Sequence, residues 1–420
     1  MTKRLDTSSI SVVHPICCGL DVHKEKISAC LISTESQGEG VEIEIREFGT
    51  FTDELTELRE WLLSRDCPIV AMESTGVYWR PVHNVIEGYL EVILVNARHV
   101  KNVPGRKTDI ADSKWLAELL RHGLLRGSFI PEKEIRQWRE LTRARRKITE
   151  SVSDYKKRVH KLFETANIKI DSVVSDLFGV TGRNLIEKLC DNTSQLSIEI
   201  VEQMAQGSLR SKAQELHRSI QGFFEEHHRF LLSSTMRLID ILETERALIT
   251  ERLSALMAAE QELLQRLDEV PGINEVSAQS VLSELGVTLK TFVCAAALAS
   301  WAGLCPGNNE SAGKRRSGKS AVQKNSVKTI MIEIAWAAVK KKGSYYRDKY
   351  YRLRARLGPK KAIVAIAHRL LKAIFHIIKN GDSFKDLGEN YLLQKNKDKK
   401  IAQLKKMAKQ FGYELVPTEA

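Results

Sequence analysis

Two acidic residues in the stretch KTDIADSKWLAELL, residues 107 to 120, stand where a buried helix face is expected to begin. If the stretch is a helix, the leucines of WLAELL form one apolar stripe, because side chains three and four residues apart share a helix face. Steps of three or four residues backward from this stripe reach Asp112 and Asp109. An ionised carboxylate facing an apolar interior costs several kcal/mol unless it is paired or holds a metal. The stretch therefore predicts a partner for these two acids.

Two more acids stand at the ends of predicted strands. Asp21 ends the apolar run ICCGLD, and Glu73 ends CPIVAME. Each acid alone has an ordinary structural explanation, as a helix-start acid for Asp109 or a turn residue for Asp21. Carboxylates gathered at strand ends and one helix face repel one another, however, unless divalent cations lie between them, and such cations activate water and stabilise a leaving oxygen. Together, the four acids predict a metal site for phosphodiester chemistry.

The acidic motifs resemble those of a known family. GLDVHK, AMESTGVYW and GRKTDIADSKWLAELL together resemble the N-terminal DEDD domain, RuvC-like in fold, of the insertion-sequence transposases of the "one-ten" family, including its "eleven-eleven" branch. The resemblance continues through LTRARRKITESVSDYKKRVHKL and the VPGI turn to ASWAGLCPGNNESAGKRRSGKS, which is similar to the family's C-terminal transposase domain. It implies a tetrad that binds Mg²⁺ or Mn²⁺, formed by Asp21, Glu73, Asp109 and Asp112.

The resemblance also assigns a serine. In this family a serine in the turn after GLxP attacks the DNA phosphodiester and becomes covalently attached to phosphate, and Ser311 holds the matching place. A serine hydroxyl is a weak nucleophile, so nearby cations are expected to stabilise the transition state. Ser317 and Ser320 are the alternatives to Ser311. The candidate cations, which we also expect to bind nucleic acid, are Lys314, Arg315, Arg316 and Lys319.

The segment GKRRSGKS, residues 313 to 320, also fits the P-loop pattern G-x-x-x-x-G-K-[ST]. A P-loop follows a buried strand and precedes a helix, whereas the residues before this segment, PGNNESA, are polar and turn-like. Basic residues inside the loop also favour an open phosphate-binding surface over a nucleotide cradle. We therefore expect a loop that faces DNA rather than an ATPase.

The elements that must position these residues fall into distinct parts. Short apolar runs alternate with amphipathic segments first, and long helical patterns follow, so we expect an α/β RuvC/RNase H-like domain, a long helical coiled-coil middle and a mainly α C-terminal domain with a helix-hairpin-helix-like turn. The predicted strands are ICCGLDV, ISACLIST, EIREFGTF, CPIVAMES and LEVILVN. The predicted domains are a tail at 1–11, the DEDD domain at 12–132, the helical middle at 133–270 with an insertion at about 168–225, the serine transposase domain at 271–394, and a basic tail at 395–420.

Two heptad patterns in the helical middle are typical of coiled coils. A long helical hairpin within one chain and a dimer explain them equally well. The first pattern consists of Leu141, Ile148, Tyr155 and Leu162, interleaved with Val152 and Val159. The second consists of Leu242, Ile249, Leu256 and Leu263, interleaved with Ile239, Leu253 and Leu267.

Positive charge is concentrated in the C-terminal third. The chain of 420 residues has a formal net charge of +12, and residues 271 to 420 hold 28 Lys and Arg against 11 Asp and Glu. This excess predicts a polyanionic partner, nucleic acid before membrane. In YYRDKYYRLRAR, tyrosines interleave with arginines, which suits base stacking beside phosphate contacts, although a solvated charged helix is the alternative. The residues expected to bind nucleic acid there are Tyr346, Arg347, Arg352 and Arg354.

The sequence thus favours a DNA transposase or recombinase of an insertion sequence, with DNA ends and a target as partners. The family resemblance implies a guide RNA encoded by the element and assembly into a homo-oligomer, a dimer or tetramer. Two alternatives stay open, a stand-alone RuvC-like nuclease without serine chemistry and a non-enzymatic nucleic-acid-binding protein. Seven cysteines without a CxxC pair and the absence of an apolar leader predict a cytoplasmic, nucleoid-associated protein.

Overall fold

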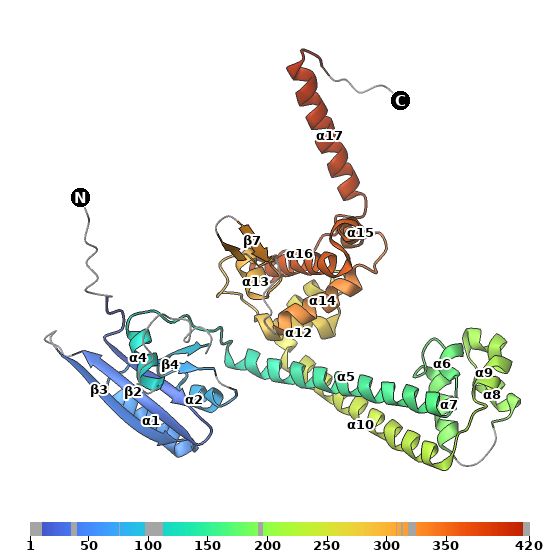
Figure 1. Ribbon diagram of the computed structural model, residues 1–420, viewed down its shortest axis with the longest axis horizontal. Coiled ribbons are helices and arrows are strands. Elements are labelled where there is room, and N and C mark those ends of the chain that lie inside the picture. Colours follow the sequence, from blue (N-terminus) through green and yellow to red (C-terminus); the bar gives the residue numbers. More distant parts are fainter. Residues whose placement is uncertain are drawn as a thin grey trace. The chain divides into compact units, whose positions relative to one another are not determined.

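The computed structural model divides into two compact units, Met1–Ile130 (unit 1) and Pro131–Ala420 (unit 2) (Figure 1). It describes residues 11–34, 40–74, 76–96, 112–191, 196–307, 309–311, 314–317 and 325–414. Within these residues, none of the helices is long and apolar enough to cross a membrane.

Unit 1 is built on a five-stranded sheet in the order β3-β2-β1-β4-β5. The first three strands pair antiparallel, and β1, β4 and β5 run parallel. The five predicted strands are all present, although β3 begins earlier than the predicted EIREFGTF because it follows the whole length of β2. The strands are β1 (Ile16–Val22), β2 (Lys26–Thr34), β3 (Val41–Gly49), β4 (Ile69–Glu73) and β5 (Glu91–Val95).

Helices cover both faces of this sheet. The helices α1 (Thr52–Ser64) and α2 (Trp79–Ile86) pack on the face that carries Leu20 and Met72. The helix α4 (Asp112–Arg121) packs on the other face through Ala117 and Leu120. This mixed α/β arrangement confirms the RuvC-like fold expected for the N-terminal part.

A long helical hairpin begins unit 2. The helices α5 (Lys133–Thr165) and α10 (Glu226–Leu256) lie side by side in Figure 1. Val152 and Val159 of α5 and Ile239 of α10 are buried in one core. The parts of the two heptad patterns on α5 and α10 therefore meet in a hairpin within one chain, whereas Leu263 and Leu267 of the second pattern lie on α11 (Gln261–Asp268).

The insertion between these two helices is a small helical lobe that shares one apolar core with the end of the hairpin. The sequence shows little pattern there because the helices are short and each has only a few buried positions, such as Leu185, Val201 and Leu216. The lobe contains α6 (Ile170–Val173), α7 (Val180–Cys190), α8 (Ile198–Met204), the 3₁₀ helix η1 (Gly207–Lys212) and α9 (Ala213–Ser219).

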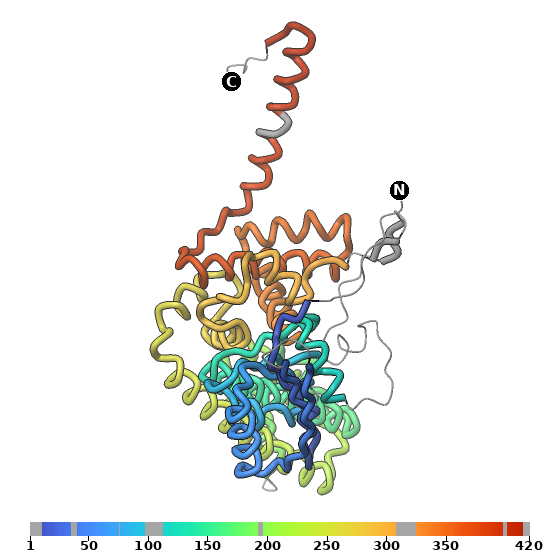
Figure 2. The backbone as a smooth tube through the Cα atoms, turned by 90° about the vertical axis from the view of Figure 1, so that its left-hand side faces the viewer, coloured from blue at the N-terminus to red at the C-terminus, as the bar shows by residue number. Residues whose placement is uncertain are grey.

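The remainder of unit 2 is mainly helical, as predicted. Its core surrounds α16 (Pro359–Asn380), whose buried residues include Ile366, Leu370 and Ile374. The other elements are η2 (Ala258–Glu260), α11 (Gln261–Asp268), α12 (Glu275–Leu285), α13 (Ala295–Trp301), β6 (Asn309–Ser311), β7 (Lys314–Ser317), α14 (Ser326–Ala338), α15 (Tyr345–Leu357) and α17 (Tyr391–Gln410). The basic tail predicted from residue 395 is thus largely helical, and α17 projects beyond α15 and α16 in both ribbon and tube views (Figures 1 and 2).

The Pro-Gly turn before α12 is tightly packed. Gly272 has φ +85°, and a Cβ there would lie 2.4 Å from the carbonyl oxygen of Ile334, so only glycine fits. Asn274 follows as the N-cap of α12, and its side-chain oxygen accepts the backbone N–H of Ser277 at 3.0 Å. Asn274 therefore has a structural role as a helix cap.

Candidate active site

The parallel pairing of β1 and β4 brings Asp21 and Glu73 to one edge of the sheet. The last register pair is Leu20 with Met72, and the two acids come one residue later on adjacent strands. Alternate residues of a strand share a face. Ile69 and Ala71 pack on the α4 side of the sheet, so Glu73, two residues after Ala71, lies on that side too. Cys17 of β1 also packs on that side, so Asp21, four residues later, lies there as well. The two acids therefore share one edge and one face.

The helix α4 brings Asp112 to the same edge. A Cβ on Gly19 would lie 2.1 Å from the carbonyl oxygen of Ser113, so the helix backbone passes directly over β1 at this glycine. The Ser113 hydroxyl lies 3.2 Å from that of Ser28, the register partner of Asp21. Since Asp112 opens the helix beside Ser113, its backbone stands at the Asp21 end of the sheet. Anionic groups are also favoured at a helix N-terminus.

A histidine that the sequence analysis did not assign belongs to this edge. His23 Nε2 lies 3.1 Å from Asp21 Oδ2, and the side chain of Asp21 is 27% exposed. The spacing D-x-H on an extended chain places both side chains on one face, so the motif GLDVHK did contain the signal. His23 is suited to orient the carboxylate, and its own side chain is 62% exposed.

The fourth predicted acid, Asp109, lies outside the described residues. Within the described part of the chain, the carboxylate oxygens of Asp21, Glu73 and Asp112 do not all lie within 4.8 Å of one another. The donor set nevertheless suits a hard divalent cation, because carboxylate oxygens are the ligands that Mg²⁺ and Mn²⁺ prefer. Asp21, Glu73 and Asp112 would hold the metal, with Asp109 as the predicted fourth ligand.

Ser311 lies in a short β-hairpin. The strands β6 and β7 pair antiparallel with Ser311 opposite Lys314 and Glu310 opposite Arg315, and the register shifts near Asn309. Residues 314 to 317 are therefore a strand and not the phosphate-binding turn that a P-loop requires. This agrees with the expectation that the P-loop pattern is fortuitous. Lys319 and Ser320 lie outside the described residues.

Comparison with known proteins identifies two regions of the chain. The family model for the DEDD domain of IS110 transposases matches residues 18–168, and the model described as "Transposase IS116/IS110/IS902 family" matches residues 264–352. The chain belongs to the IS110 family of transposases. No curated protein gives a significant match.

Membership of the IS110 family establishes the general activity. An IS110 transposase recombines DNA during transposition of an insertion sequence, so DNA is a partner of this chain. A DEDD domain also implies dependence on a divalent metal. The first match includes the three described acids and the second includes the hairpin with Ser311, so both candidate sites lie in family-matched regions.

The residues of α15 that were predicted to bind nucleic acid differ in accessibility. Tyr346 is 6% exposed and packs on Phe384, with ring centroids 6.3 Å apart, so its ring is not available for base stacking. Burial raises the pKa of the Tyr346 hydroxyl far above its ordinary value, and the nearby charge of Asp386 adds to this shift. The tyrosine spacing was therefore misleading because this side of α15 faces the core of unit 2.

The three arginines of α15 that were predicted to bind nucleic acid reach solvent to different degrees. Arg347 lies over the Tyr351 ring at 5.6 Å and donates to the carbonyl oxygen of Lys340 at 3.2 Å. Arg352 pairs with Asp348 at 2.9 Å, and Arg354 is exposed. These three residues remain candidates for nucleic-acid binding in this IS110 transposase.

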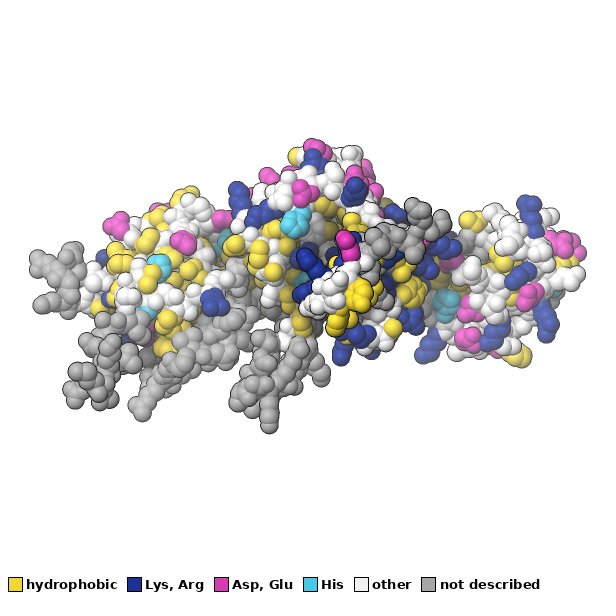
Figure 3. Space-filling model, turned by 90° about the horizontal axis from the view of Figure 1, so that it is seen from above, with side chains coloured by type: hydrophobic (Ala, Val, Ile, Leu, Met, Phe, Trp, Pro, Cys, Tyr) yellow, Lys and Arg dark blue, Asp and Glu magenta, His cyan; other side chains and the backbone are white. Residues whose placement is uncertain are grey.

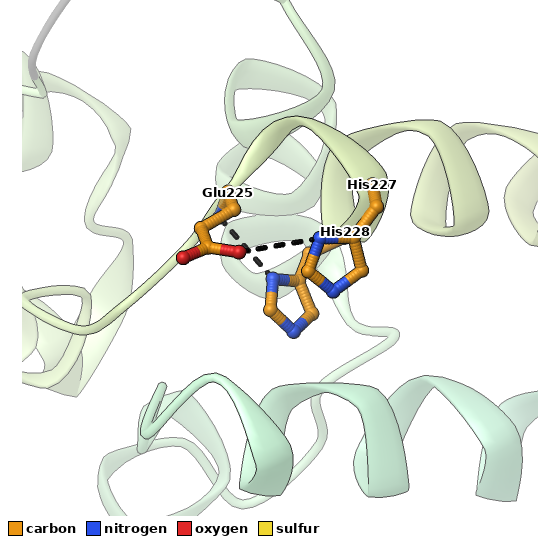
Figure 4. A group of neighbouring side chains, drawn as sticks. All are labelled: Glu225, His227 and His228. Atoms are coloured by element: carbon orange, nitrogen blue, oxygen red, sulfur yellow. Dashed lines mark hydrogen bonds and ion pairs between the residues drawn. The ribbon is translucent and has the colours of Figure 1, made fainter.

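The His-containing cluster at the start of α10 has a different character from the acidic edge (Figure 4). Glu225, His227 and His228 offer ligand atoms within 4.8 Å of one another. The Glu225 backbone N–H donates to His228 Nδ1 at 3.2 Å, and the Glu225 carboxylate lies 3.3 Å from His227 Nδ1. These contacts satisfy the first turn of the helix, and they occupy the Nδ1 lone pair of His228. We assign the cluster to helix capping.

Proposed function

We propose that this IS110 transposase cuts and rejoins DNA by combining a carboxylate-held metal centre with the Ser311 nucleophile. The observation that carries the proposal is the edge of the sheet in unit 1, where β1, β4 and the first turn of α4 gather Asp21, Glu73 and Asp112. Asp109 completes the set by family resemblance. When bound there, Mg²⁺ or Mn²⁺ supplies charge stabilisation to the phosphate and lowers the pKa of a bound hydroxyl or water.

In the proposed reaction, Ser311 Oγ forms a bond to phosphorus while the bond from phosphorus to one sugar oxygen breaks. The serine proton leaves to a base, and the departing sugar oxygen takes up a proton. Attack by a sugar hydroxyl of another strand then releases the serine and makes the new joint. Lys314, Arg315, Arg316 and Lys319 stabilise the charge on the phosphate.

The acids and the serine serve one reaction in this proposal, although between about 200 and 290 residues separate them in sequence. The family resemblance favours a dimer or tetramer. It also favours an element-encoded RNA that selects both DNAs by base pairing, which requires a basic surface for the nucleic-acid backbone rather than a base-reading helix.

A recombination assay tests this proposal. Purified protein with its co-purifying RNA is incubated with donor and target plasmids and Mg²⁺, and joints are scored together with protease-sensitive protein–DNA adducts. Wild type should form both. Asp112→Asn should form neither, whereas Glu118→Gln on the same helix should behave like wild type.

The serine is tested by the same readouts. Ser311→Ala should form neither joints nor adducts, while Ser317→Ala should retain both. Cleaved ends without adducts in the wild type, unchanged in Ser311→Ala, would instead identify a stand-alone metal-dependent nuclease. Joints that form normally with Ser311→Ala but not with Ser317→Ala would move the nucleophile to Ser317.

A further inference from the structure

Four cations from three helices of unit 2 converge near two tyrosines. Lys349 and Arg352 come from α15, Arg369 from α16 and Lys395 from α17. We call these four residues the α15–α17 cation cluster. Only Arg352 among them was expected from the sequence to bind nucleic acid, because the other three become neighbours only when the helices pack.

Contacts through two tyrosines link Arg369 and Lys395 of the α15–α17 cation cluster. Arg369 Nη1 donates to the Tyr345 hydroxyl at 3.3 Å, and the Tyr345 and Tyr391 rings lie 5.9 Å apart. Lys395 Nζ lies 5.5 Å from the centre of the Tyr391 ring. Tyr345, Lys349 and Arg352 share one face of α15, because they follow one another at spacings of four and three residues. The cluster is thus a defined juxtaposition of three helices.

Among the side chains that the structure describes, few acids balance the charges of this cluster. Asp348 pairs with Arg352, while Asp386 accepts the backbone N–H groups of Tyr345 and Gly388, each at 3.0 Å. Partial burial lowers the pKa of the Lys349 ammonium, and the nearby charges of Arg369 and Arg352 lower it further. Gathered like charges cost stability in the free protein. An anionic ligand would offset this cost.

The lysines of α17 extend the positive charge away from the cluster. Lys395, Lys406 and Lys409 share one helix face and span about 21 Å at 1.5 Å per residue. One strand of duplex DNA places about six phosphates over that length. Lys406 and Lys409 are exposed, and Lys and Arg side chains gather on the surface around α17 in Figure 3. This geometry fits an extended polyanion better than a single phosphate.

We propose that the α15–α17 cation cluster and the lysine face of α17 form one continuous site for the phosphodiester backbone of a nucleic acid. The proposal rests on the proposed function only for its choice of ligand, DNA or the element's RNA. The opposite face of α17 exposes Leu393, Leu404 and Phe411, at 59%, 51% and 74%. A basic amphipathic helix of this kind also suits an anionic membrane surface. We favour nucleic acid because half of the site lies on α15 and α16 and because the chain belongs to a family of transposases that recombine DNA.

The salt dependence of binding tests this proposal. Fluorescence anisotropy of the full-length protein is measured with a labelled DNA duplex and with the element's RNA at several salt concentrations. The test variant is the triple change Lys349→Gln, Arg369→Gln and Lys395→Gln. The control triple, Lys341→Gln, Lys342→Gln and Lys397→Gln, removes the same formal charge from exposed positions outside the site.

The test triple should lower the slope of log affinity against log salt by about 2.7 on duplex DNA or about 2 on single-stranded RNA, since each lost phosphate contact removes about 0.9 or 0.7. At 0.1 M salt this corresponds to binding weaker by about a hundredfold or more. The control triple should change the slope by less than 1. A loss confined to DNA or to RNA identifies the ligand, and a loss on both shows a shared site.

Equal losses in the two triples would mean that only net charge matters, and the proposal would be overturned. So would a test triple that loses binding to phosphatidylserine vesicles while it keeps its affinity for both nucleic acids. If the test triple does not fold, the single change Lys395→Gln on exposed α17 should still lower the duplex slope by about 0.9.

Two further results separate this proposal from the proposed function. A wild type that binds as expected but forms no joints would contradict the recombination chemistry alone. If the wild type forms joints normally but the test triple binds nucleic acid like the control triple, only the cation site would be contradicted.

Discussion

The acidic edge of unit 1 and the serine hairpin of unit 2 are built in opposite ways. Asp21 and Glu73 stand on adjacent strands of a five-stranded sheet, and Asp112 opens a helix that touches the sheet backbone at Gly19. Ser311 instead lies in a two-stranded hairpin of three and four residues. A hairpin of this size is only marginally stable by itself. The acids are therefore positioned by a core, whereas the serine depends on the local pairing of β6 and β7.

The largest expected effect separates metal binding from nucleophilic attack. Asp112→Asn and Ser311→Ala should each reduce joint formation by about a thousandfold or more, because the first removes charge stabilisation by a metal, which amounts to several kcal/mol, and the second removes the nucleophile. Only the first should also lose the rise in Tm that Mn²⁺ produces, because a ligand stabilises the fold only when it binds. Differential scanning fluorimetry with and without Mn²⁺ measures this. A Tm rise that survives in Asp112→Asn would remove that residue from the metal site.

Gly19→Ala should damage the acidic edge through packing. The added Cβ would lie 2.1 Å and 2.5 Å from backbone atoms of Ser113 and Ala117, neither of which can move as a flexible side chain does. Overpacking of this kind costs about 1–3 kcal/mol, and it should push the start of α4 away from Asp21. We expect lower Tm, weaker Mn²⁺ stabilisation and lost activity together. Denaturant unfolding measures the stability change.

Gly127→Ala is the matched control for this change. Among the described residues, a Cβ at Gly127 would meet only the Ile93 side chain at 3.6 Å, which is ordinary contact. Its stability and activity should stay close to those of the wild type. If Gly19→Ala were equally harmless, the close approach of α4 to β1 would not position the acids.

In the serine hairpin, a substitution should lower activity while stability stays close to that of the wild type. Arg315→Pro removes a backbone N–H and disturbs the pairing with Glu310, because proline is excluded from the interior of paired strands. We expect joint formation to fall by more than tenfold, with Tm close to the wild-type value because β6 and β7 pair only with each other within the described residues. Arg315→Gln, which keeps the N–H, isolates the contribution of the charge. A large drop in Tm for Arg315→Pro would place the hairpin within the folding core.

The sequence predicted elements better than it predicted contacts. Apolar runs ending at Asp21 and Glu73 revealed two strands, because buried strands have a strong local pattern. The register that makes these acids neighbours depends on a parallel pairing between residues about 50 positions apart, which no local pattern encodes. The family resemblance had already indicated that Asp21 and Glu73 belong to one site. His23 was missed although its spacing from Asp21 was visible.

Arg145, at a heptad position of α5, is a second residue whose contacts could not be predicted from the local pattern. Arg145 interrupts the first heptad pattern, yet it is 4% exposed and donates to the Gln279 side chain at 2.6 Å and to the Val276 carbonyl oxygen at 2.9 Å. Burial lowers its pKa to about 10, while the charge of Glu275 opposes this shift. The apparent defect is thus one of the arginines that join α5 to α12, together with Arg139 and Arg143. Tyr346 is the reverse case, since its pattern suggested exposure and its neighbours bury it.

The smallest expected effect concerns a surface charge on the face of the unit 1 sheet that α1 and α2 cover. Glu44 of β3 accepts from Arg46 at 2.7 Å and pairs with Arg65 at 3.0 Å. Slight burial raises the pKa of the Glu44 carboxyl, but the hydrogen bond and charge of Arg46 and the charge of Arg65 outweigh it and hold the pKa below its usual range. A carboxyl with a lowered folded pKa stabilises the fold above its unfolded pKa, about 4.3, and this contribution disappears as pH falls through the folded value.

Glu44→Gln should therefore lower the free energy of unfolding by at most about 1 kcal/mol at pH 7, with the difference closing in acid. Urea unfolding at pH 7 and at a series of pH values below 4.3 measures this. Mn²⁺ stabilisation and joint formation should not change, because the packing of α4 on the other face positions the acids. Loss of metal binding in Glu44→Gln would show that charge on β3 reaches the acidic edge, and the contrast between a core-built acid site and a locally built serine site would lose its basis.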